Sequence, residues 1–218
     1  MKKALIISYA FITLAACYNS FSQEHKRAED SLINKLENKI DTTEIICDSI
    51  YKKKGYKLII EKLFDSHSYD ENDFNAIFIF SKLINGKYEA IFKDSILSHD
   101  VNIKFEDFNN DKIKDILIEN ISDVRSNLTY YLYIIDLTHD KLKKVKGFNE
   151  IKNPNYLPEY NLIDNYVLSG SIWTSFYEIK NNKVIDYGIT IYDDQKDDGK
   201  YERDYKKAIN KIIAKKKK

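Results

Sequence analysis

The strongest constraint on how this chain can fold is a turn at Asn85-Gly86, which lies between two apolar segments at residues 74–84 and 87–92. Asn and Gly both tolerate the positive φ angles of a two-residue hairpin turn, and such a turn joins antiparallel strands. The flanking segments are rich in Ile, Phe and Tyr, which favour strands over helices. The sequence therefore predicts a β-hairpin at this position.

Similar segments recur from residue 42 onward, where Gly and Pro are scarce and the apolar residues follow a period of two. They predict strands at residues 45–51, 56–64, 74–84, 87–92, 101–105, 116–120, 129–137, 141–148, 160–168, 171–179 and 183–192. A loop is expected at residues 153–158, where Pro occurs twice. Many short strands with turns between them are typical of an all-β antiparallel meander, either propeller-like or a sandwich. A faint repetition suggests hairpin-based units at residues 56–92, 101–148 and 160–192.

Helices are expected only near the two ends of the chain. Apolar residues recur at helical spacing over residues 24–41, and residues 205–214 favour a short closing helix or a frayed tail. The expected organisation is a secretory signal at 1–22, a helical leader at 23–41, a single β domain at 42–205, and a helix with a basic tail at 206–218. The lysine run at 215–218 is expected to be solvated.

The first residues have the pattern of a secretory signal. Two lysines precede an almost wholly apolar segment, which is too short to be a permanent membrane anchor. Residues 14–17 (Leu-Ala-Ala-Cys) resemble a lipobox that ends at a lipidated Cys17, whereas residues 20–22 (Ser-Phe-Ser) suit ordinary signal cleavage. Both endings predict export, to the periplasm, to the outer membrane as a lipoprotein, or to the medium. The membrane contact expected is through a lipid on Cys17.

Charge and cysteine content describe the exported part. The whole chain carries +1, so removal of the two N-terminal lysines gives 1 − 2 = −1, and setting aside the four C-terminal lysines gives −1 − 4 = −5. The body is therefore mildly acidic, and no nucleic-acid partner is expected. Besides Cys17 the chain contains only Cys47, so an internal disulfide is excluded. Cys47 follows two isoleucines, which favours a buried, inert thiol.

An acidic loop is the clearest candidate site. In the segment Asp-Phe-Asn-Asn-Asp-Lys-Ile-Lys-Asp at residues 107–115, oxygen-bearing side chains occupy the first, third, fifth and ninth positions. Apolar segments flank it on both sides. A hard cation such as Ca²⁺ takes about six to eight oxygen ligands, which alternating side chains and a backbone carbonyl can supply in part. The alternative is a metal-free loop in which these side chains hydrogen-bond to the turn.

This loop resembles the calcium loop of FG-GAP/VCBS-type β-propeller repeats, which lies between two strands of a blade. The resemblance implies a structural Ca²⁺ with side-chain ligands Asp107, Asn109, Asp111 and Asp115 and the carbonyl of Ile113. It also implies that Phe108 and Ile116 fix the loop to the blade.

The chain departs from this family pattern at Lys112, where the family loops usually have Gly. That position often needs positive φ, which costs a residue with a Cβ on the order of 1 kcal/mol.

The wider order of segments also resembles one group of exported proteins. An Asn-Gly hairpin, a Ser-His-Asp segment at 98–100, the acidic loop, a Tyr-rich strand and a Thr-x-x-Tyr-Glu strand at 174–178 follow each other. This order is similar to that of small exported bacterial β-propeller-like proteins. The group includes periplasmic immunity proteins that inhibit peptidoglycan hydrolases, so the resemblance implies an envelope protein as partner, in particular a lysozyme-like hydrolase.

No catalytic motif of comparable strength is present. Adjacent residues on an extended chain alternate sides, so Ser98, His99 and Asp100 cannot form a catalytic triad. The four histidines lack metal-ligand spacing. Polar clusters at 65–73 and 193–199 are interpreted as ordinary loops, with a turn at Asp198-Gly199. No catalytic residue is therefore assigned.

The expected function is binding rather than catalysis. A non-enzymatic envelope protein that binds another protein is the first hypothesis. A carbohydrate- or peptidoglycan-binding module is the alternative, because aromatic residues, including Trp173, Phe176 and Tyr177, cluster late in the chain, and Tyr and Trp suit such contacts. A hydrolase with an unrecognised carboxylate pair ranks last.

Overall fold

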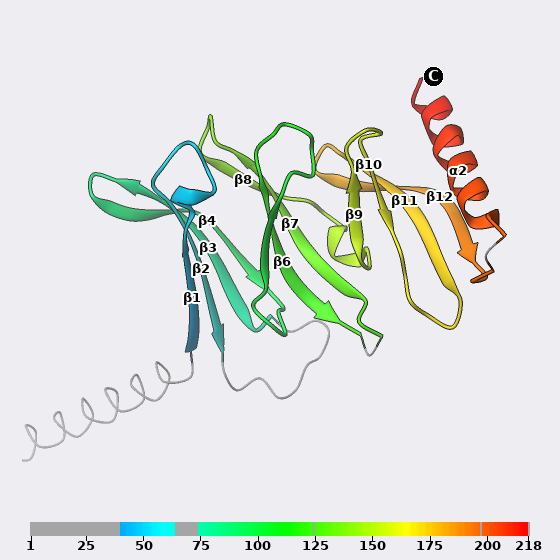
Figure 1. Cartoon of the computed structure of the whole chain (residues 1–218). Coiled ribbons are helices and arrows are strands. Elements are labelled where there is room, and N and C mark those ends of the chain that lie inside the picture. Colours follow the sequence, from blue (N-terminus) through cyan, green and yellow to red (C-terminus); the bar gives the residue numbers. More distant parts are fainter. Residues whose placement is uncertain (1–39, 64–73, 124, 197, 218) are drawn as a thin grey trace, which may run out of the picture. The chain divides into compact units, whose positions relative to one another are not determined.

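β-Strands make up most of the described part of the chain (Figure 1). The structure is a computed structural model that describes residues 40–63, 74–123, 125–196 and 198–217. Nearly all of these residues belong to one compact unit, which comprises Thr42–Lys62 and Ser68–Lys218. The other unit, Met1–Asp41 with Leu63–His67, lies largely outside the described residues.

Twelve described strands form three antiparallel sheets of four, each a meander of consecutive strands. Sheet A contains β1 (Ile40–Ile46), β2 (Tyr56–Leu63), β3 (Ala76–Ile84) and β4 (Lys87–Ile96). Sheet B contains β5 (Ile103–Glu106), β6 (Asp115–Ser122), β7 (Leu128–Asp136) and β8 (Lys141–Lys144). Sheet C contains β9 (Pro154–Leu157), β10 (Leu162–Asn165), β11 (Ile172–Lys180) and β12 (Lys183–Asp193). The expected all-β antiparallel meander is confirmed, and each hairpin-based unit lies within one sheet.

The hairpin between β3 and β4 has the predicted turn. Asn85 and Gly86 have φ angles of 50° and 79°, and Ile84 pairs with Lys87 across them. Because both turn residues adopt positive φ, the twist of the turn matches that of the flanking strands.

Two predictions were wrong, one of a strand and one of a loop, and each concerns the outer strand of a sheet. The predicted strand at 45–51 ends at Ile46, and Cys47–Ser49 form the short 3₁₀ helix η1. Residues 153–158, predicted as a loop, contain β9, which begins at Pro154. Pro154 is tolerated because it is the first residue of an edge strand, where its missing N–H costs no ladder hydrogen bond.

The predictions for the chain ends have different outcomes. The signal at 1–22, Cys17 and nearly all of the helical leader at 23–41 lie outside the described residues, but Ile40 and Asp41 belong to β1 rather than to a helix. The closing helix is longer than predicted, because α2 spans Lys200–Lys216.

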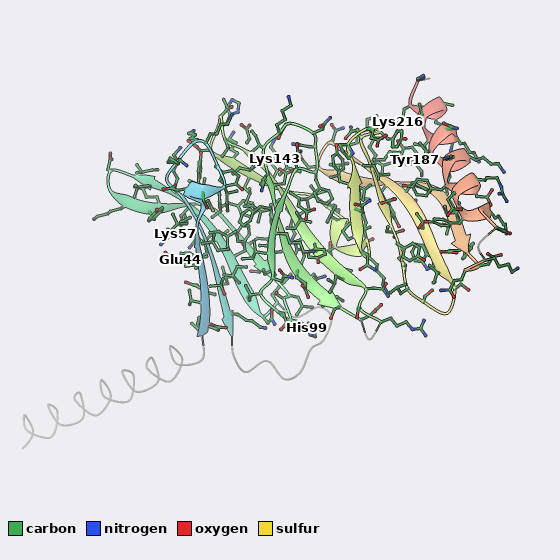
Figure 2. All side chains as sticks on the ribbon, viewed as in Figure 1. Glu44, Lys57, His99, Lys143, Tyr187 and Lys216 are labelled. Carbon is green, nitrogen blue, oxygen red and sulfur yellow. The ribbon has the colours of Figure 1, made fainter. Side chains whose placement is uncertain are left out.

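The basic tail was expected to be solvated, and Lys216 is exposed but also contacts sheet C. Its Nζ lies 3.0 Å from Glu178 Oε1, and it donates to the carbonyl of Asn161 at 3.0 Å. Tyr187 also donates to Glu178, so β12 and α2 converge on one carboxylate (Figure 2). This contact ties the C-terminal turn of α2 to sheet C.

Three hydrophobic clusters hold the described layers together. The first joins sheet A, through side chains such as Leu58 and Phe78, to sheet B, through Ile116 and Tyr133. The second joins the opposite face of sheet B to sheet C and to the short 3₁₀ helix η2 (Phe148–Glu150). The third lies between sheet C and α2. Both faces of sheet B are therefore buried, which explains why its central strands are apolar almost throughout.

Among the described residues, no helix is both long enough and apolar enough to cross a membrane.

Candidate functional site

The acidic loop connects β5 to β6 in the middle sheet. Glu106 pairs with Asp115 at the base of the loop, so Asp107–Lys114 project beyond the hairpin. Phe108 lies fully buried in the second cluster, with its ring centroid 5.3 Å from that of Phe148 and 5.6 Å from that of Tyr156. Ile116 is fully buried in the first cluster. Phe108 and Ile116 thus fasten the loop on opposite faces of sheet B.

Asp107 organises the turn through its carboxylate. Oδ1 accepts hydrogen bonds from the N–H groups of Asn109 (3.1 Å) and Asn110 (2.7 Å), and Oδ2 accepts one from the N–H of Lys112 (2.8 Å). Side-chain acceptors of this kind stabilise turns whose own carbonyl groups cannot reach the N–H groups. The first residue of the candidate ligand set therefore has a structural role without a cation.

Asn109 and Asp111 continue the same pattern. Asn109 Oδ1 accepts from the N–H of Asp111 at 3.1 Å, and Asp111 Oδ1 accepts from the N–H of Ile113 at 2.7 Å. The two side chains also meet, since Asn109 Nδ2 donates to Asp111 Oδ2 at 2.9 Å.

Asp115 is the buried member of the set. Its side chain is fully buried, and its two oxygens accept from the N–H groups of Phe108 (3.0 Å) and Ile135 (3.2 Å). Burial, opposed by the two N–H groups and aided by the charges of Asp111 and Asp107, raises the pKa of Asp115 to about 7. A buried carboxyl group whose pKa lies so close to neutral would be held in its ionised form by a nearby cation.

Two residues of the loop have a left-handed backbone. Lys112 has a φ of 67°, so a residue with a Cβ occupies a left-handed position where Gly is usual. Asn110 is also left-handed, with a φ of 61°. The expectation of positive φ at position 112 is confirmed.

The donor chemistry of the loop fits a hard cation, because three carboxylates, an amide oxygen and the Ile113 carbonyl are all oxygen ligands. The side-chain oxygens point toward N–H groups of the protein, since every side-chain oxygen of the four residues already accepts a hydrogen bond. In the described part of the chain, no group of three His, Cys, Asp or Glu side chains is arranged to hold a metal ion. Asp107 Oδ1 accepts two of these hydrogen bonds, but each of the other side-chain oxygens accepts one and keeps a second lone pair, through which it could also bind a cation.

Two other residues that the sequence singled out are structural. Cys47 is fully buried, and burial raises the pKa of its thiol to about 11, which confirms the predicted inert cysteine. Ser98 is buried, and its hydroxyl donates to the carbonyl of Glu119 at 2.9 Å. That hydroxyl is therefore committed to the backbone of β6, in agreement with the exclusion of a triad.

The two polar clusters predicted as loops have different outcomes. The cluster at 65–73 lies mostly outside the described residues. At the second, Asp198 Oδ1 accepts from the N–H of Lys200 at 2.8 Å and Gly199 has a φ of 66°, which confirms a turn at the start of α2.

Sequence reasoning missed a carboxylate that joins sheet A to the β7–β8 turn. Asp140 Oδ1 lies 2.7 Å from Lys53 Nζ and 2.6 Å from Lys82 Nζ, and it also accepts from the Tyr56 hydroxyl. Burial opposes ionisation of Asp140, but these donors outweigh it and hold its pKa well below the usual range. Its partners are 58 to 87 residues away in sequence, so no local pattern could have revealed them.

The uncovered face of sheet A is the second feature that sequence reasoning missed. Alternation turns Leu58, Ile60, Phe78 and Phe80 into the first cluster, so their neighbours point the opposite way. We call this the outer face of sheet A, and its apolar side chains are Ile46, Ile59, Ile77, Ile79, Leu83 and Tyr88. None of the six belongs to a described core cluster, and Ile77 is 45% exposed.

Comparison of the chain with protein-family models, with curated proteins and with solved structures gave no match.

Proposed function

We propose that the protein is an exported, non-enzymatic envelope protein that binds another protein through the outer face of sheet A. The observation that carries this proposal is the row of isoleucines on a sheet face that no described cluster covers. Ile59 pairs directly with Ile79, and Ile77 follows on the same face of β3.

An antiparallel sheet with one solvated face normally alternates apolar residues inward with polar residues outward. The outer face of sheet A departs from this rule at several neighbouring positions on β2 and β3. Contiguous exposed apolar side chains typically mark an interaction surface. Complete burial of an Ile side chain contributes about 1.5–3 kcal/mol, so covering a half-exposed Ile77 contributes roughly 1 kcal/mol.

Charged side chains border the apolar row. Lys57 Nζ lies 3.2 Å from Glu44 Oε2, and it also lies 4.5 Å from the centroid of the Tyr88 ring (Figure 2). Protein interfaces commonly combine an apolar centre with a polar rim of this kind. The arrangement supports a protein partner over a small apolar ligand.

The sharpest form of the proposal is inhibition of a peptidoglycan hydrolase, as in the immunity proteins that the sequence resembles. The body of the chain, at −5, favours encounter with a basic enzyme through charge complementarity. Three consecutive four-stranded meanders that pack through successive hydrophobic clusters support a propeller-like arrangement of blades over a two-sheet sandwich.

We also propose that the acidic loop takes a structural Ca²⁺, held by Asp107, Asn109, Asp111, Asp115 and the carbonyl of Ile113. The ion would add a positive charge beside the buried Asp115 and would staple β5 to β6. Its role is stability rather than catalysis.

The partner proposal is tested with purified peptidoglycan hydrolases from the same envelope. Their binding to the protein is measured by calorimetry and their activity by clearing of a peptidoglycan suspension. The wild type should bind and inhibit at least one of them. Ile77→Glu should weaken binding at least tenfold, because it places a charge in the centre of the interface.

Ile185→Glu is the matched control, because Ile185 is 42% exposed and lies on β12 of sheet C. It should bind like the wild type. Equal binding by Ile77→Glu and the wild type would assign the wrong face, and binding of glycan fragments without any hydrolase would refute a protein partner.

The calcium proposal is tested by thermal unfolding with Ca²⁺ or with a chelator. Ca²⁺ should raise the Tm of the wild type and leave that of Asp111→Ala unchanged. An equal Tm of the wild type in Ca²⁺ and in chelator would favour the metal-free loop.

A further inference from the structure

A hollow of about 420 Å³ lies at one end of sheet C. One wall is the turn that precedes β11, Ser169 to Ile172, and the other is the end of β12 with the following residues, Tyr192 to Gln195. The volume is within the range of small-molecule sites, about 300–1,000 Å³. Nothing in the acidic loop or the outer face of sheet A contributes to it.

Tyr192 provides an exposed aromatic surface at this hollow. Its side chain is 64% exposed, although Tyr is a residue that usually buries much of its ring. Tyr192 pairs with Trp173 on the adjacent strand, so the two rings project from the same face of sheet C. Trp173 is the one tryptophan of the chain and is partly buried.

The remaining lining is polar and is held in place. Asp193 Oδ2 accepts from the Tyr166 hydroxyl at 2.8 Å, and Asp193 Oδ1 accepts from the N–H of Gln195 at 2.8 Å. Gln195 has a φ of 59°, a left-handed conformation that is costly for a residue with a Cβ. These contacts engage the Asp193 carboxylate on the face of β12 opposite to Tyr192 and fix the end of the strand at the wall of the hollow.

Asp194 supplies a second carboxylate. The N–H of Lys196 donates to Asp194 Oδ1 at 3.2 Å, and Lys196 Nζ lies 3.4 Å from its Oδ2. The hydrogen bond from the Lys196 N–H, together with the lysine charge, lowers the pKa of Asp194, so it is an ionised acceptor at neutral pH. The hollow therefore combines an aromatic surface with acceptors for hydroxyl groups.

We propose that this hollow binds a neutral saccharide, with the ring of Tyr192 against the C–H face of one sugar unit and the carboxylate of Asp194 accepting from its hydroxyl groups. A carboxylate has two oxygens and can accept from two neighbouring hydroxyls of one ring. A tyrosine ring offers apolar area at little entropic cost. The Asp194 carboxylate disfavours uronic acids and phosphorylated glycans, because like charges repel, and Lys196 offsets part of that charge. This site goes beyond the protein-binding proposal and does not depend on it.

Trp173 is the cross-strand neighbour of Tyr192, so its fluorescence should report binding at the hollow. The full exported chain is titrated with chitotetraose and cellotetraose as neutral probes and with tetragalacturonate as the acidic probe. Tryptophan emission and calorimetric heat are both recorded. At least one neutral probe should shift the emission and bind with a Kd of about 0.1–5 mM, which is usual for one shallow site and corresponds to roughly 3–5 kcal/mol.

Two variants locate the site. Tyr192→Ala should weaken binding of the neutral probe at least tenfold, and Asp194→Asn at least threefold, with thermal unfolding used to verify that both variants are folded. Tyr88→Ala is the control, because Tyr88 is a 37% exposed tyrosine on sheet A, and it should bind like the wild type.

The proposal would be overturned if neither neutral probe gave heat or a change in emission at concentrations 10-fold above the expected Kd range. Binding by Tyr192→Ala as tight as that of the wild type would also overturn it, as would equal or tighter binding of tetragalacturonate. If Tyr192→Ala loses saccharide binding but still binds the hydrolase, the saccharide site is separate from the protein-binding face.

Discussion

Replacement of Lys112 with Gly is expected to stabilise the protein, although it removes a side chain and its charge. Lys112 has a φ of 67°, and this conformation costs a residue with a Cβ roughly 1–2 kcal/mol. Gly avoids that cost but gives the unfolded chain more freedom, which costs about 0.4–1 kcal/mol. The expected net change is a gain of about 0.5 kcal/mol in the free energy of unfolding.

Lys114→Gly is the matched control. Lys114 is also an exposed lysine of the loop, but it is not among the residues with positive φ. Its replacement brings only the cost in the unfolded chain, so stability should fall by about 0.4–1 kcal/mol. The two variants should therefore differ by about 1–2 kcal/mol with opposite signs.

Urea unfolding and calorimetry measure this difference, and 1 kcal/mol corresponds to about 2–4 °C in Tm for a chain of this size. Both variants lose one positive charge near the loop, so the comparison cancels most of the effect of charge on Ca²⁺ affinity. A loss of stability in Lys112→Gly as large as that in Lys114→Gly would refute the left-handed backbone at position 112.

The remaining predictions concern the core and two carboxylates. Phe176→Ala should lower the free energy of unfolding by about 3–5 kcal/mol in urea, because Phe176 is fully buried between sheet C and α2. Asp140→Asn should cost about 1–2 kcal/mol at pH 7, and the difference from the wild type should vanish as pH falls through the lowered pKa of Asp140, because protonation removes the same charge. Burial raises the pKa of Asp115 from 3.8 to about 7, so the folded state binds its proton more tightly than the unfolded state. Without Ca²⁺, this residue should therefore make stability fall as pH rises from about 4 to about 7, by at most about 4 kcal/mol, and Asp115→Asn should remove that part of the pH profile.

The inner strands of each sheet could be predicted because local chemistry determines them. Asn85-Gly86 specifies its own turn, and the alternation in residues 56–63 and 76–80 follows directly from which face meets sheet B. β9 was missed because Pro154 is normally a sign of a loop. Only the position of β9 at the edge of sheet C makes Pro154 compatible with a strand.

The acidic loop was located from sequence because its ligand spacing is local, and Lys112 was correctly expected to adopt positive φ. Its internal hydrogen bonds could not be derived, since a carboxylate that binds a cation and one that accepts backbone N–H groups occupy the same sequence positions. Asp140 is a stronger example of this limit. It joins Lys53 and Lys82 across many residues of chain, and only the packing of sheet A beside the β7–β8 turn brings them together.

The outer face of sheet A could not be predicted from the sequence either. Ile77 and Ile79 belong to an apolar segment that reads as a strand buried on both faces, like β6. The structure distinguishes the two strands, because β6 has a sheet on each side and the outer face of sheet A has no described cluster on it.

The most direct test of a protein partner is site-specific photo-crosslinking in intact cells that express the full chain. A photo-reactive amino acid is placed at Ile77 or, as control, at Ile185, and the adducts are identified by mass spectrometry. The proposal predicts one dominant exported protein, a peptidoglycan hydrolase, crosslinked at position 77 and absent at position 185. The same adducts at both positions, or none at position 77, would contradict a partner on the outer face of sheet A.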